Sequence, residues 1–181
     1  MPYEMTEHRH RFAAWAAARA VQRGWGSSKT EKLRGALESS GVREFVCSPA
    51  ARGIDERRFG ELHRQWCREV IKSLTQQGVA DATFGRAAKL VAVYLKVMVV
   101  LSPDGDCDLA LVAHPPTDRT ELQLAAEVGV DSAHKRYWKT VNWTQLTEED
   151  YYSLIGQLRA LIPSTDPFWT LEQYWNVADD S

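Results

Sequence analysis

The fold is decided by the stretch TFGRAAKLVAVYLKVMVVL, which spans residues 83–101. Most of its side chains are apolar, and neither Gly nor Pro occurs after Gly85. Its five valines also suit a β-strand, but a run of this length without a helix breaker favours a helix. Thr83 can cap the first turn. We therefore predict a central helix that is buried on most sides.

Helical patterns continue on both sides of this segment. Phe59, Leu62, Trp66 and Val70 recur at helical spacing, and Ser28 and Glu31 fit a capping box ahead of a helix that Gly41 ends. Loops are expected at 45–54 and 102–116, and a polar, irregular stretch at 129–145. Helices are predicted at 7–23, about 30–41, 55–76, 83–101, 118–128, 147–163 and from Pro167 onward. The chain therefore indicates a single all-α domain over residues 1–181 with about seven or eight helices.

Composition excludes several classes of protein. The 181 residues suffice for one domain, and 44% hydrophobic with 25% charged residues exclude disordered, collagen and coiled-coil chains. No apolar run is long enough for a membrane span, and residues 1–11 lack the apolar core of a signal peptide, so we expect a cytoplasmic protein without membrane partners. Cys47, Cys67 and Cys107 are odd in number and widely spaced, which indicates reduced packing residues.

The net charge of −2 conceals an asymmetry along the chain. Residues 1–100 hold 17 Lys and Arg against 10 Asp and Glu, whereas residues 101–181 hold 5 against 14. A basic half can contact a polyanion, although solvated basic helix faces explain the same counts.

Two residues suggest chemistry. Lys89 lies near the start of the apolar helix, and Asp118 follows 29 residues later, after two prolines, at a predicted helix start. A helix N-terminus stabilises a carboxylate, and an apolar setting disfavours the charged form of a lysine, as an amine nucleophile requires. The alternative is structural: Asp118 caps its helix with Glu121 as its box partner, and Lys89 and Lys96 extend to solvent.

The remaining pattern is a sequence of four features. A glycine-bearing turn is followed by a helix with a lysine, then by a loop, and then by Pro116-Thr117-Asp118 at the start of another helix. This layout resembles the helix-hairpin-helix DNA glycosylases, most closely the small 8-oxoguanine DNA glycosylase branch. The resemblance covers about residues 76–128. The usual hairpin carries two or three closely spaced glycines, whereas Gly78 and Gly85 here are seven residues apart.

The resemblance implies roles for individual residues. Lys89 would attack C1′ of the nucleotide, and Asp118 would activate water or stabilise the sugar cation. Lys96 shares a helix face with Lys89 and competes for the lysine role. The hairpin amides would hold a DNA phosphate. No metal or organic cofactor is required, although the family hairpin often holds a structural monovalent cation. The implied partner is DNA with its modified base flipped out, without an obligatory protein partner.

Supporting residues follow from what base excision requires. Arg86 and Arg119 flank the two helix starts and are candidates for phosphate contacts. The irregular stretch supplies Tyr137, Trp138 and Trp143 as candidates for a base pocket. The base edge could be contacted by His114 and His134. Four tryptophans at helical spacings are expected in the core: Trp15, Trp66, Trp169 and Trp175. Four arginines could border the DNA: Arg9, Arg11, Arg19 and Arg23.

The resulting hypothesis is a DNA glycosylase that removes a modified base from DNA. If Lys89 attacks C1′, a Schiff base forms and strand cleavage can follow, whereas Asp118 acting alone leaves an abasic site. The base would be an oxidised purine or a hypermodified phage base such as glucosylated hydroxymethylcytosine, the latter in anti-phage defence. One alternative is a toxin ribonuclease, because Arg58 and His63 have the R-x4-H spacing that resembles the HEPN motif. The other is a non-catalytic helical module that binds DNA. The glycosylase hypothesis requires Lys89 and Asp118 to converge on one cleft.

Two further patterns are weak. His63 and Cys67 lie one helical turn apart, as metal ligands can, but no other ligands are evident. Asp104, Asp106 and Asp108 resemble the start of a calcium loop, yet Gly and Glu are missing from its sixth and twelfth positions, so a turn is expected.

Overall fold

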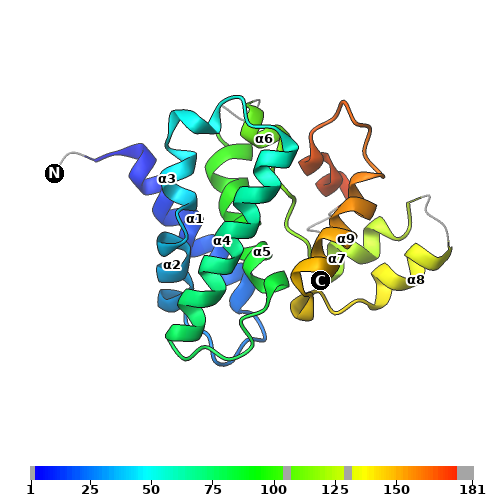
Figure 1. The fold of residues 1–181 in the computed structure, drawn as a ribbon, viewed down its shortest axis with the longest axis horizontal. Coiled ribbons are helices and arrows are strands. Elements are labelled where there is room, and N and C mark those ends of the chain that lie inside the picture. Colours follow the sequence, from blue (N-terminus) through cyan, green and yellow to red (C-terminus); the bar gives the residue numbers. More distant parts are fainter. Residues whose placement is uncertain (1–2, 104–106, 129–131, 175–181) are drawn as a thin grey trace.

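The computed structural model describes residues 3–103, 107–128 and 132–174. Every regular element in these ranges is helical, which confirms the predicted all-α class. Figure 1 shows α1 to α6 gathered on one side of the molecule and α8 and α9 on the other. The α-helices are α1 (Met5–Gln22), α2 (Thr30–Ser39), α3 (Val42–Val46), α4 (Glu56–Gln76), α5 (Phe84–Leu95), α6 (Asp108–Val112), α7 (Arg119–Ala125), α8 (Ser132–Thr140) and α9 (Glu148–Arg159). The shorter elements are η1 (Pro49–Ala51), a π-helical turn η2 (Lys96–Val100), η3 (Trp143–Gln145) and η4 (Phe168–Tyr174).

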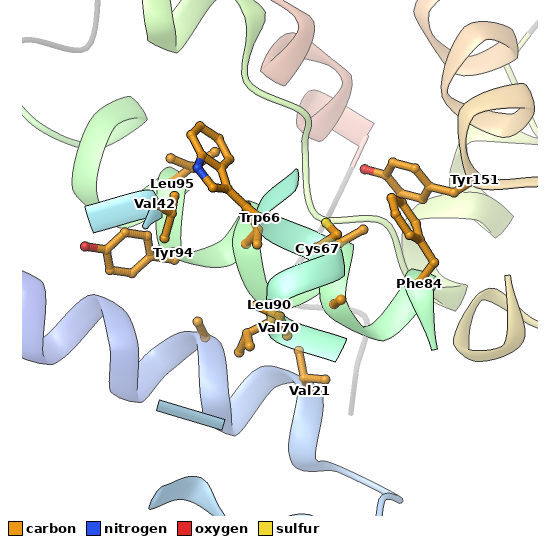
Figure 2. Packing of buried hydrophobic residues seen from close by; sticks show 14 of the residues in the cluster. Val21, Val42, Trp66, Cys67, Val70, Phe84, Leu90, Tyr94, Leu95 and Tyr151 are labelled. Carbon is orange, nitrogen blue, oxygen red and sulfur yellow. The ribbon is translucent and has the colours of Figure 1, made fainter. Parts of the chain in front are cut away.

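Helix α5 is central, as its apolar sequence predicts. It packs against α1, α2, α4 and α9, and η2 continues it. Helix α1 can lie close to it because the α1 residues that are buried include four alanines, whose small side chains leave room: Ala13, Ala14, Ala17 and Ala18. Figure 2 shows Trp66 of α4 and Tyr94 of α5 within the same apolar cluster. The buried cluster reaches from α1 to η4, so one core holds both sides of the molecule together.

Most predicted helix starts are confirmed by their caps. Thr83 accepts a hydrogen bond from the backbone N–H of Arg86, and Thr147 forms a full capping box with Asp150. The box predicted at Ser28 is wrong. Lys29 occupies the N-cap position of α2, and the Ser28 hydroxyl donates instead to the carbonyl of Trp25 at 2.9 Å.

Two helices lie where loops were expected. Helix α6 forms within 102–116 because Leu109 and Ala110 are buried and Asp108 accepts a hydrogen bond from the backbone N–H of Gly53 at 2.7 Å. Helix α8 forms within 129–145, although its residues are modest helix formers, because buried Trp138 fixes it to the core. Tertiary packing thus outweighs local propensity in both segments.

The four tryptophans expected in the core differ in their burial. Trp66 is in the core as expected, but the prediction for Trp15 is wrong, because this side chain is 48% exposed on α1. Trp169 is half-buried. Trp175 and the turn expected at 104–106 lie outside the described residues. Among the described helices, none is long and apolar enough to cross a membrane.

Candidate active site

Lys89 and Asp118 meet in space although 29 residues separate them. Lys89 projects from the second turn of α5, and Asp118 is the N-cap residue of α7. The Nζ atom of Lys89 lies 2.8 Å from Oδ2 of Asp118. The lysine side chain is 10% exposed and the aspartate side chain 30%, so the pair is largely shielded from solvent on the lysine side.

Asp118 has two roles at once. Its Oδ1 atom caps α7 by accepting from the backbone N–H of Glu121 at 3.1 Å, while Oδ2 accepts from Lys89. Burial alone would raise the pKa of Asp118, but the charge and hydrogen bond of Lys89 and the amides at the helix start outweigh it and lower the pKa. Asp118 is therefore a carboxylate at neutral pH.

The pair borders a pocket of about 200 Å³ between α1, α5, α7 and η4. Lys96 also lines this pocket and forms an ion pair with Glu172 of η4 at 2.6 Å. Three of the lining residues are apolar. The full lining is Ala20, Lys89, Val93, Lys96, Pro116, Asp118, Glu121 and Glu172. A ligand in this pocket would meet two lysines and three carboxyl groups within an otherwise apolar wall.

Glu121 is the most deeply buried carboxyl group of the pocket, at 3% exposure. Burial, with the negative charges of Glu172 and Asp118, raises its pKa to about 8. Its Oε1 atom has no hydrogen-bond partner among the described residues. The predicted capping box is only half formed, because the Asp118 side chain caps Glu121 but no bond from the Glu121 side chain returns to the helix start.

Trp143 lies on the other side of Lys89, with its ring centre 4.6 Å from Nζ. A second pocket of about 350 Å³ adjoins it and is lined by Arg119, Thr140, Val141, Asn142 and Trp143. Gly85 makes this arrangement possible, because a Cβ atom there would lie 2.0 Å from the carbonyl oxygen of Trp143. The absence of a side chain at position 85 lets η3 cross the start of α5.

The hairpin amide expected for a DNA phosphate is already used within the chain. The backbone N–H of Gly85 donates to the carbonyl of Leu146 at 3.1 Å, and the Thr83 hydroxyl donates to the carbonyl of Thr144 at 2.5 Å. Residues 143–146 therefore cover the start of α5, which is where a DNA phosphate would bind according to the resemblance.

Five of the predicted contact residues lie away from both pocket linings: Arg86, His114, His134, Tyr137 and Trp138. His134 lies on α8, with its ring centre 6.0 Å from that of Trp138. Tyr137 is partly exposed on α8, whereas Trp138 is buried, with its indole N–H donating to Gln157 at 3.0 Å. Arg86 stacks over the ring of Trp25, 4.4 Å from its centre, and donates to the carbonyl of Asp81. His114 is buried in the core, where burial holds its pKa well below its usual value. Trp138 and His114 are thus core residues rather than pocket residues.

His63 and Arg58 do not form a joint site. His63 is fully buried, and burial lowers its pKa to about 3, so it is a neutral core residue beside the hydroxyl of Tyr152 at 2.9 Å. Arg58 is exposed and forms an ion pair with Glu61. His63 also contacts Cys67, yet among the described residues no group of three or more His, Cys, Asp or Glu side chains could hold a metal ion.

Sequence reasoning missed two members of the pocket. Glu121 was read only as a capping partner, and Glu172 carries no signal, because nothing in the sequence places η4 beside α7. Nothing in the sequence distinguishes Glu121 from a solvated capping glutamate, because its burial depends on tertiary packing such as that of η4 against α7.

Comparison of the chain with protein-family models, with curated proteins and with solved structures gives no match. Its function must therefore be argued from the geometry of the site.

Proposed function

We propose that the protein is a DNA glycosylase that cleaves the bond between a modified base and its deoxyribose. The observation that carries this proposal is the convergence of Lys89 and Asp118 on one pocket, with Nζ and Oδ2 2.8 Å apart. The two groups are those that the resemblance assigns to the reaction, and the fold brings them together although 29 residues separate them.

The carboxylate of Asp118 suits the charge that develops in such a reaction. As the C1′–N bond breaks, its electron pair leaves with the base and the sugar becomes cationic. Asp118, ionised and fixed by the α7 amides, stabilises that cation and accepts a proton from the water whose oxygen bonds to C1′. The departing base takes up a proton, and an abasic site remains.

The ion pair favours water over Lys89 as the nucleophile. An ammonium that donates to Asp118 has no free electron pair, so it cannot attack C1′ while the pair persists. We therefore assign Lys89 a positioning role for Asp118, and propose a glycosylase that leaves an abasic site without cutting the strand.

The DNA would lie across the face that carries Arg119 and Trp143. Arg119 is exposed at the start of α7 and lines the second pocket, where it can meet a phosphate. Trp143, beside Lys89, offers an aromatic surface for a base. We keep both substrate classes, an oxidised purine and a hypermodified phage base, because a substituent can project past the partly exposed Asp118.

The test is base release from T4-type phage DNA and from duplexes with oxidised guanine. Wild type is compared with Asp118→Asn, which keeps an N-cap, and with Asp55→Asn as a matched control. Asp55 caps α4 in the same manner but lies outside the pocket. Loss of abasic sites in Asp118→Asn alone supports the proposal, and borohydride should trap no lysine adduct. Failure of wild type on both substrates would contradict it.

A second candidate, a non-catalytic module that binds nucleic acid, rests on the outer face of α1. Phe12 and Trp15 are 53% and 48% exposed, with ring centres 5.8 Å apart, and Arg19 follows at helical spacing. Aromatic and basic side chains on one face are typical of nucleic-acid contacts. This candidate predicts salt-sensitive binding without base release. The ribonuclease alternative is not favoured, because His63 is buried away from substrate.

A further inference from the structure

The fold gives no structural role to the buried carboxyl group of Glu121. It is 3% exposed, lines the 200 Å³ pocket, and leaves Oε1 without a partner among the described residues. A buried polar atom without a hydrogen bond costs about 1–3 kcal/mol, so such groups are rare unless they serve a purpose. Glu121 therefore needs a reason other than stability.

Helix capping does not supply that reason. The side chain occupies the third helical position of α7, where a capping box would use it, but it makes no capping bond. In α9 the equivalent residue, Asp150, completes its box through the backbone N–H of Thr147. The same chemistry was thus available to Glu121, and its side chain lies in the pocket wall instead.

The charged groups that face Glu121 come from four elements. Lys89 of α5 and Lys96 of η2 favour its ionised form, whereas Asp118 of α7 and Glu172 of η4 oppose it. Both lysines are already paired, Lys89 with Asp118 and Lys96 with Glu172. Helix α1 contributes only Ala20 to the pocket lining. Burial and the two carboxylates prevail, and with a pKa of about 8 Glu121 is mostly a neutral carboxylic acid at pH 7.

A neutral carboxylic acid presents one O–H donor and one carbonyl acceptor side by side, whereas a carboxylate only accepts. The last side-chain torsion of glutamate is broad and roughly twofold, so either oxygen can turn toward an occupant. The complement of this pair is an adjacent acceptor and donor on one edge of a flat ring. Cytosine offers N3 with its 4-amino group, and a cyclic amide offers C=O with N–H.

We propose that Glu121 is a specificity-determining residue that binds the extruded base through an adjacent donor and acceptor on its edge. This inference rests on the proposed function, because it takes the occupant of the pocket to be a base. The pocket of about 200 Å³ leaves room for a flat heterocyclic base. Val93, Pro116 and Ala20 give such a ring apolar surfaces to contact.

Glu121→Gln tests the proposal because glutamine keeps one donor and one acceptor at every pH. Glu121→Leu removes both, and Glu56→Gln, in the exposed first turn of α4, is the matched control. The probes are free cytosine and uracil, with unsubstituted pyrimidine as a ring that only accepts. Ligand-observed NMR titrations at pH 6.5, 7.5 and 9.0 give the affinities.

Cytosine or uracil should bind to wild type at pH 6.5, and pyrimidine should bind at least about tenfold more weakly. Glu121→Leu should lower the affinity at least about tenfold, whereas Glu121→Gln should stay within about threefold of wild type. At pH 9.0 wild type should weaken and Glu121→Gln should not, because only the glutamate ionises near pH 8. Glu56→Gln should match wild type throughout.

Equal affinity in wild type and Glu121→Leu would overturn the proposal, as would a Glu121→Gln variant as weak as Glu121→Leu. Failure of wild type to bind cytosine and uracil in preference to pyrimidine would overturn it as well. These titrations need no DNA cleavage. Binding of free bases without base release would therefore count against the glycosylase and not against Glu121, and the reverse result would count against Glu121 alone.

Discussion

At the scale of single residues, Asp118 joins stability to the proposed chemistry. Its two carboxylate oxygens serve different partners, the amide that it caps and the ammonium of Lys89. A sequence can predict the first role, since Asp is favoured at N-caps. Local sequence rules do not predict the second role, which only the resemblance requires, because the pairing with Lys89 depends on where the tertiary fold places the start of α7.

We expect Asp118→Ala to lower the free energy of unfolding by about 2–4 kcal/mol. The change removes a helix cap and leaves Lys89, which is 10% exposed, without its carboxylate. The lower part of the range applies because Asp118 is 30% exposed. Urea unfolding at pH 7 measures the loss. Asp118→Asn also removes the ion pair but should lose less because it keeps the cap, and equal losses in the two variants would show that the cap adds nothing.

Glu121 should impose a pH dependence on stability that Glu121→Gln removes. Its pKa is raised to about 8 in the folded protein from 4.5, so the folded state holds a proton that the unfolded state releases between those values. Its contribution is complete below pH 4.5 and falls by up to about 1.4 kcal/mol per pH unit until pH 8. Urea unfolding at several pH values provides the comparison. Parallel curves for wild type and Glu121→Gln would refute the raised pKa.

At the scale of elements, the sequence predicts the long helices well and the short ones poorly. Helices α1, α4, α5 and α9 follow from periodicity, caps and breakers, which are local properties. Helix α8 does not follow from these local properties, because the burial of Trp138 in the core stabilises it rather than the helix propensity of its own residues. The crossing of η3 over α5 could not be predicted from the sequence either, although Gly85 lies at the crossing point.

Gly85→Ala should destabilise the protein by more than about 2 kcal/mol and weaken the contact between Lys89 and Trp143. The new Cβ atom would lie 2.0 Å from the Trp143 carbonyl oxygen, so η3 must move. Thermal unfolding reports the first effect. Because the chain has seven tryptophans, the second is taken as the difference in fluorescence between Gly85→Ala and Gly85→Ala combined with Trp143→Phe. Gly35→Ala is the control, because α2 has open space there and alanine favours helix by about 0.5–1 kcal/mol. A Gly85→Ala variant as stable as Gly35→Ala would contradict the close crossing.

At the scale of the whole molecule, the pocket combines charged residues from the basic and the acidic half of the sequence. The pocket takes Lys89 and Lys96 from the basic half and Asp118, Glu121 and Glu172 from the acidic half. A count of charges along the sequence can predict a basic surface for a partner, but it cannot predict that lysines and carboxyl groups from the two halves meet in one pocket. Exposed Arg19 on α1 and Arg23 directly after it are among the basic side chains available to a polyanion.

If α1 borders the DNA, Arg19→Gln combined with Arg23→Gln should reduce the salt dependence of binding. The slope of log affinity against log salt should fall by about 1–2, at about 0.9 for each phosphate contact. Fluorescence anisotropy with a labelled duplex gives this slope. Arg57→Gln, whose side chain is 84% exposed on α4, is the control. An equal fall in that variant would show that the effect reflects overall charge rather than contact through α1.

The central claim is that Asp118 and Lys89 form the active site of a DNA glycosylase. Its most direct test is the initial rate of abasic-site formation in modified DNA by wild type, Asp118→Asn and Asp55→Asn, each confirmed to be folded. We predict a rate for Asp55→Asn equal to wild type and a rate for Asp118→Asn at least about 100-fold lower. Abasic sites formed equally by all three proteins, or by none of them, would contradict the claim.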